Sequence, residues 1–175
     1  MRSLLLLLAL LPAVSRLQAA ELVTRTFYVS GIECGSCVYM VQQSVAGTKG
    51  VSEVMVVQVI DGYANVTFDP AVVSDQQIAQ AVREAYPLHG TPYVAALKLK
   101  VADFAKNAAK VEGLFAEWKK FLKLEVMDKG AGDLTVHFLP LEADKKKAGP
   151  QGWSFGQWME AAGKQGVKFK LAQEG

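Results

Sequence analysis

The chain has 175 residues, enough for one medium-sized domain or two small ones. Its formal net charge of +2 gives little reason to expect a nucleic-acid partner. Its two cysteines are too few for a disulfide framework, and they stand three positions apart, so their role is local.

The N-terminal segment is typical of a secretory signal. Arg2 precedes an apolar run over residues 4–11, and small residues follow as far as Ala20. The run is shorter than the roughly 20 apolar residues that span a bilayer, and no later stretch reaches that length. We therefore expect residues 1–20 to be a signal peptide, cut after Ser15 or Ala20. The mature protein would be periplasmic or secreted, without a stable membrane span.

Residues 21–92 carry the element order β-α-β-β-α. Apolar alternation and helical spacing predict strands over 22–29, 51–60 and 63–68, and helices over 36–46 and from Ser74 onward. Asp61-Gly62 is a two-residue hairpin signal, and Ser74 with Gln77 forms a capping box. A last strand between residues 86 and 101 would complete a ferredoxin-like β-α-β-β-α-β sandwich.

The second half repeats this order without cysteine. The patterns predict strands over 95–101, 124–127, 134–138 and 167–171. They also predict a helix over 104–122 and a second helix, capped by Ser154, that runs to about 163. The fold class is therefore α+β, with two ferredoxin-like units in tandem. Residues 93–175 would be a degenerate unit that lacks the metal motif. Whether residues 91–101 end the first unit, begin the second or do both is open at this stage.

Charge divides the chain in the same place. Residues 21–90 have three basic and seven acidic side chains, whereas residues 91–175 have fourteen lysines and ten acidic side chains. Two units of net −4 and +4 could attract each other or face different partners, and solvated surfaces that differ by chance explain the split equally well. The aromatic group of Trp153, Phe155 and Trp158 is expected to be buried over the second sheet rather than exposed.

The chemistry is concentrated in Gly31-Ile32-Glu33-Cys34-Gly35-Ser36-Cys37, which follows a strand and opens a helix. Unpaired backbone N–H groups and the helix dipole favour thiolate at such a position. Two thiolates on one turn suit a soft ion such as Cu(I). A closed zinc site would need two further ligands from elsewhere.

This segment resembles the Gly-Met-x-Cys-x-x-Cys motif of heavy-metal-associated domains, with Ile32 in place of Met. The resemblance runs without gaps over residues 25–88 and includes the Asp-Pro turn after residue 68 and the Ala85-Tyr86-Pro87 ending. It implies a non-enzymatic metal chaperone or scavenger that binds its ion through Cys34 and Cys37. Cu(I) is favoured, with Hg(II), Zn(II) or Cd(II) as alternatives. The implied partner is a metal donor or acceptor, such as a metal-transporting membrane protein.

An exported thiol–disulfide oxidoreductase, with Cys34 as the attacking thiol, is the alternative. The thioredoxin type usually has Trp before the first cysteine, where this chain has Glu33. We see no nucleophile–base pairing or phosphate loop that would favour an enzyme. His89 could reach the ion as a third ligand, but we expect it to be a solvated loop residue. His137 is expected to have a packing or surface role.

Overall fold

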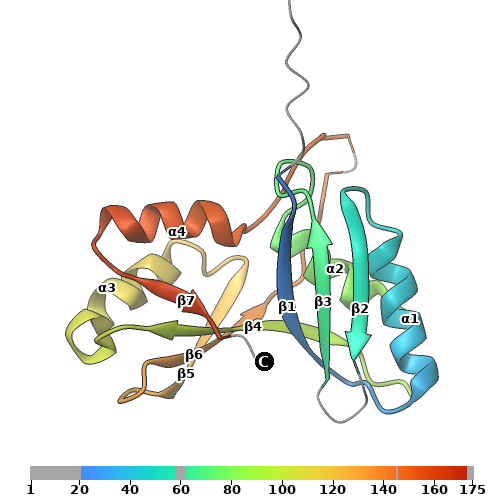
Figure 1. The fold of residues 1–175 in the computed structure, drawn as a ribbon, viewed down its shortest axis with the longest axis horizontal. Helices are drawn as coiled ribbons and strands as arrows, with labels where there is room; N and C mark the ends of the chain where they lie inside the picture. Colours follow the sequence, from blue (N-terminus) through green and yellow to red (C-terminus); the bar gives the residue numbers. More distant parts are fainter. Residues whose placement is uncertain (1–20, 58–61, 145, 173–175) are drawn as a thin grey trace, which may run out of the picture.

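The computed structural model describes residues 21–57, 62–144 and 146–172. The predicted signal peptide, Asp61 of the predicted hairpin and Lys145 lie outside these ranges. The elements in chain order are β1 (Val23–Ser30), α1 (Gly35–Ala46), β2 (Val51–Val57), β3 (Tyr63–Phe68), α2 (Asp75–Glu84), β4 (Val94–Val101), α3 (Phe104–Ala116), β5 (Leu122–Asp128), β6 (Asp133–Phe138), α4 (Phe155–Lys164) and β7 (Phe169–Leu171) (Figure 1). No helix within the described ranges is long and apolar enough to cross a membrane.

The strands form a single antiparallel sheet in the order β2-β3-β1-β4-β6-β5, and β7 also pairs with β4. One edge of β4 pairs with β1 through residues 94–96 and then with β7 through residues 99–101. The other edge pairs with β6. Strand β4 is therefore both the last strand of the first β-α-β-β-α-β unit and the first strand of the second, as its long path across Figure 1 shows. This confirms the predicted fold class, while the domain boundary between residues 92 and 93 stays a prediction.

The two units also share one hydrophobic core. Alternate residues of the strands point inward, and the resulting cluster runs continuously from Phe27 and Val41 in the first unit to Phe115 and Phe169 in the second. Trp153, Phe155 and Trp158 lie inside this cluster, as predicted. Since a continuous core removes apolar surface of both units from water, each unit stabilises the other.

The predicted helix over residues 104–122 is too long, because α3 ends at Ala116. Trp118 and Phe121 lie in the turn that follows, and Leu122 already begins β5, opposite Phe138. The periodicity misleads here because the turn and the next strand place their apolar side chains on the same core. The last strand is also shorter than predicted and begins at Phe169.

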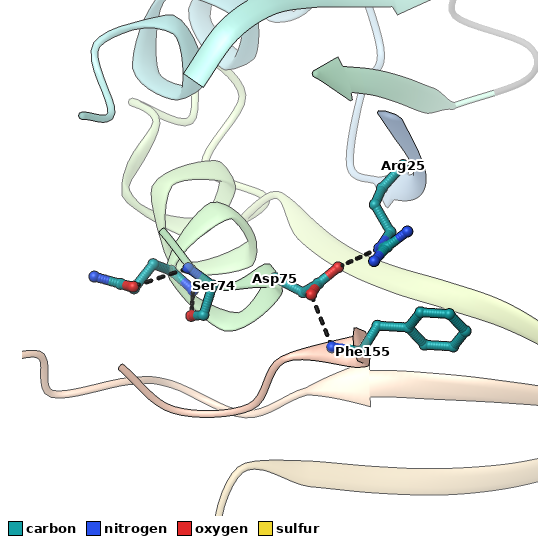
Figure 2. A network of polar contacts seen from close by, with 5 residues as sticks. Arg25, Ser74, Asp75 and Phe155 are labelled. Atoms are coloured by element: carbon teal, nitrogen blue, oxygen red, sulfur yellow. Dashed lines mark hydrogen bonds and ion pairs between the residues drawn. The ribbon is translucent and has the colours of Figure 1, made fainter. Parts of the chain in front are cut away.

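Ser154 stands at the predicted N-cap position of α4, but its side chain makes no capping hydrogen bond. The backbone N–H of Phe155 donates instead to Oδ2 of Asp75, at 2.8 Å. Asp75 is the first residue of α2, so a carboxylate of the first unit satisfies the N-terminus of a helix in the second (Figure 2). The positive ends of two helix dipoles thus meet one negative charge.

Asp75 is almost completely buried, at 2% exposure, and is also paired with Arg25 of β1. Arg25 Nε donates to Asp75 Oδ1 at 2.9 Å (Figure 2). Burial raises the pKa of the Asp75 carboxyl above its ordinary value. Arg25 and the Phe155 amide lower this pKa, but they offset the effect of burial only in part. This one carboxylate therefore holds β1, α2 and α4 together.

The predicted capping box of Ser74 and Gln77 is present at the start of α2. The same helix is also held against the second unit by side-chain hydrogen bonds. The side-chain amide of Gln76 donates to the carbonyl of Leu139, at 2.6 Å, and Arg83 donates to the carbonyl of Phe138, at 2.9 Å. Because α2 leads directly into the segment with His89, these contacts help to set the position of that segment.

Candidate metal centre

The loop between β1 and α1 depends on a glycine at its start. Gly31 has φ +88°, and a Cβ at this position would lie 2.7 Å from the carbonyl oxygen of Pro92. Only glycine therefore allows the loop to approach the chain just before β4 so closely. Ile32 is buried beneath the loop, as expected for the apolar residue of the motif.

Cys34 and Cys37 stand at the N-terminus of α1. Cys34 is the N-cap residue, and its Sγ accepts a hydrogen bond from the backbone N–H of Cys37, at 3.2 Å. The two sulfur atoms are 2.8 Å apart, and both cysteines are free. Cys34 is partly exposed, whereas Cys37 is completely buried. One turn therefore presents two sulfur atoms side by side, one of them open to solvent.

His89 is an exposed loop residue, as expected, and it also lies beside the two cysteines. Its side chain is exposed, but its Nε2 lies 3.3 Å from Sγ of Cys34. The ligand atoms of Cys34, Cys37 and His89 all lie within 4.8 Å of one another, and this group could hold a metal ion. The fold explains the meeting, because the α2–β4 and β1–α1 connections lie at the same end of a β-α-β-β-α-β unit. His137 is not part of this group and pairs with Glu125, at 2.8 Å.

The environment of Cys37 favours the thiolate. Burial by itself raises the pKa of this thiol, but hydrogen bonds from Cys34, Tyr93 and the backbone outweigh it and lower the pKa from 9.0 to about 7. Thiolate is the form that binds metal. Tyr93 was not among the predicted site residues, although strand alternation extends the inward-facing positions 95, 97 and 99 of β4 back to it.

This pKa predicts how metal binding depends on pH. Below about pH 7 a proton competes with the metal for Cys37, so the apparent affinity should fall by up to about tenfold for each pH unit. Above pH 7 this contribution should level off. Titration of the thiolate absorbance of the reduced protein should show a midpoint near pH 7 that Cys37→Ser removes. A first midpoint near pH 9 would contradict the prediction.

Comparisons with known proteins give one family match and two similar solved structures. Residues 26–87 match the family model of the heavy-metal-associated domain. No curated protein sequence matches the chain. The water-soluble region of the P-type ATPase CopA from Bacillus subtilis is 22% identical, with 89% of this chain and 98% of that chain covered at a TM-score of 0.39. A solution structure of the N-terminal soluble domains of Bacillus subtilis CopA is 20% identical, with 89% and 99% covered at a TM-score of 0.38.

The matched segment begins in β1, contains Cys34 and Cys37, and ends two residues before His89. The second unit, from α3 to β7, lies outside it. The similarity to the heavy-metal-associated domain is therefore confined to residues 26–87, within the first unit of this chain.

Proposed function

We propose that this protein binds one soft metal ion, most readily Cu(I), between Cys34 and Cys37, and acts as a metal chaperone or scavenger rather than as an enzyme. The observation that carries the proposal is the group of two sulfur atoms and one imidazole nitrogen within 4.8 Å. Thiolates select soft ions, and imidazole is an acceptable further ligand for copper.

The number of ligands guides the choice of ion. Two thiolates and one imidazole complete the low coordination that Cu(I) accepts, and two thiolates alone suit Hg(II) as another soft ion. Zn(II) is almost always four-coordinate in structural sites, and the group found among the described residues offers three ligands. Zn(II) or Cd(II) would therefore take a further ligand from water or from a partner.

The accessibility of the three ligands is consistent with transfer to or from another protein. Cys34 and His89 are open to solvent while Cys37 is closed off, so an incoming ion would meet Cys34 and His89 first. We propose a metal donor or acceptor as partner, such as a metal-transporting membrane protein. The leader-like residues 1–20 support a location in the periplasm or outside the cell.

Thiol–disulfide exchange has less support. An exchange catalyst needs an accessible thiolate to attack a disulfide. Cys37, whose pKa is lowered, has a completely buried side chain, so it is poorly placed to reach a substrate disulfide. The residue before Cys34 is Glu33, where the thioredoxin type usually has Trp.

Anaerobic titration of the reduced full chain with Cu(I), against a colorimetric chelator, tests the proposal. We expect one Cu(I) per chain, with metal–sulfur bonds and one nitrogen ligand in X-ray absorption. His89→Ala should keep the stoichiometry and both sulfur ligands but lose the nitrogen and bind more weakly, because two thiolates remain.

His137→Ala is the matched control, since this histidine is paired with Glu125 outside the site. It should bind Cu(I) as the unmodified chain does. The absence of metal–sulfur bonds in the loaded protein would overturn the proposed function. An unchanged nitrogen signal in His89→Ala would remove His89 from the ligand set while leaving the two cysteines in place.

A further inference from the structure

Tyr93 is a buried polar residue directly before β4. Its side chain is 1% exposed, and its hydroxyl makes no hydrogen bond of regular geometry within the described residues. Leaving a buried hydroxyl unpaired costs about 1–3 kcal/mol. A hydrogen-bond acceptor close to this hydroxyl would therefore stabilise it.

The available partner is the sulfur of Cys37. The Tyr93 side chain interacts with Cys37, and its neighbour Pro92 lies against Gly31 at the base of the metal loop. Cys37 is closed to water, so solvent cannot hydrogen-bond to its sulfur. A neutral thiol can be buried without hydrogen bonds at little cost, whereas a buried thiolate requires hydrogen-bond donors to stabilise its charge.

We propose that the Tyr93 hydroxyl donates a hydrogen bond to Sγ of Cys37 when this sulfur binds the metal ion, and so acts as a positioning residue of the site. The inference rests on the proposed function, because the metal-bound sulfur is the thiolate that needs the donor. His89 and Tyr93 then work from one connection between α2 and β4, with the imidazole on the exposed side of the sulfur pair and the hydroxyl on the buried side.

Two features make this contact suited to a metal site. The donor is held inside the core by β4, so it needs no reorganisation when the ion arrives. Hydrogen-bond partners of metal ligands typically contribute 10–100-fold to metal affinity. Because sulfur is a weak acceptor, we expect the lower end of this range for Tyr93.

The test is Tyr93→Phe, which removes one oxygen atom, compared with Tyr39→Phe. Tyr39 lies on α1 two residues after Cys37, but its side chain is 60% exposed. Tyr93→Phe should bind Cu(I) about tenfold more weakly than the unmodified chain, at the lower end of the range for such partners. Tyr39→Phe should bind Cu(I) as the unmodified chain does.

A second measurement is independent of metal. The Cys34–Cys37 pair is equilibrated with reduced and oxidised dithiothreitol at pH 8. Loss of the donor destabilises the reduced pair, so Tyr93→Phe should shift this equilibrium several-fold toward the disulfide. The melting temperature of the metal-free variant with the disulfide closed should not fall, since the hydroxyl then has no thiolate to bond and no regular partner to lose.

The outcomes separate the two proposals. Weaker Cu(I) binding together with the disulfide shift, in Tyr93→Phe alone, supports the inference. If the unmodified chain binds Cu(I) and Tyr93→Phe matches it in both measurements, the inference is wrong and the metal function stands. If no chain binds Cu(I), the proposed function fails, and the inference fails with it. A large drop in melting temperature would make Tyr93 a structural residue and also overturn the inference.

Discussion

Replacing Cys37 by serine is expected to lower the affinity for Cu(I) by more than about a hundredfold. Hydrogen-bond partners of ligands are already worth 10–100-fold, and this change removes a ligand itself. The serine hydroxyl stays protonated near neutral pH and is a hard donor, so it replaces neither the charge nor the softness of the thiolate. Chelator competition under anaerobic conditions measures the loss.

Cys34→Ser should have an effect of the same order, because both sulfur atoms are needed around one ion. Ser36→Ala is the matched control, since Ser36 lies between the cysteines and its side chain is exposed. It should leave the affinity unchanged. Retention of tight 1:1 binding in either serine variant would contradict the two-thiolate site.

Asp75→Ala is expected to reduce the free energy of unfolding by about 3–5 kcal/mol, the range for breaking a buried ion pair by removing one partner. The change leaves the Arg25 guanidinium, whose side chain is 12% exposed, without its carboxylate. It also leaves the Phe155 N–H at the start of α4 without its acceptor. Urea denaturation of the metal-free protein measures the loss.

The control for Asp75 is an ion pair with the same separation but full access to water. Lys164 and Glu160 are 2.9 Å apart and more than 70% exposed, and exposed pairs contribute little. Glu160→Ala should therefore change the unfolding free energy by less than about 1 kcal/mol. If Asp75→Ala and Glu160→Ala have similar effects, Asp75 does not hold β1, α2 and α4 together.

Local features of this protein could be predicted from its sequence. The capping box of Ser74 and Gln77 spans four residues, and the alternation of β1 and β3 shows in their own side chains. Cys34 and Cys37 lie three residues apart at a helix N-terminus, so their proximity follows from local geometry alone. Each of these features is set by hydrogen bonds or periodicities that close within one turn or one strand.

The double role of β4, as a strand of both units, could not be predicted from the sequence. Residues 94–101 show one alternating pattern, and that pattern would serve a last strand or a first strand equally well. Only the pairing with β1, β6 and β7 reveals that β4 fills both positions. Hydrophobic alternation reports which face of a strand is buried, but it carries no information on which strands lie at its two edges.

The completed site also depends on contacts between distant residues. His89 lies 55 positions from Cys34 along the chain, and Phe155 lies 80 positions from Asp75. A lone histidine in a loop and a serine before a helix have ordinary local explanations, so the sequence favoured a solvated His89 and a cap from Ser154. The sequence by itself therefore determined the two-cysteine turn and most of the elements around it. Tertiary structure decided the place of His89 beside the cysteines, the burial of Tyr93 and the Asp75 cap, because long-range packing alone brings those groups together.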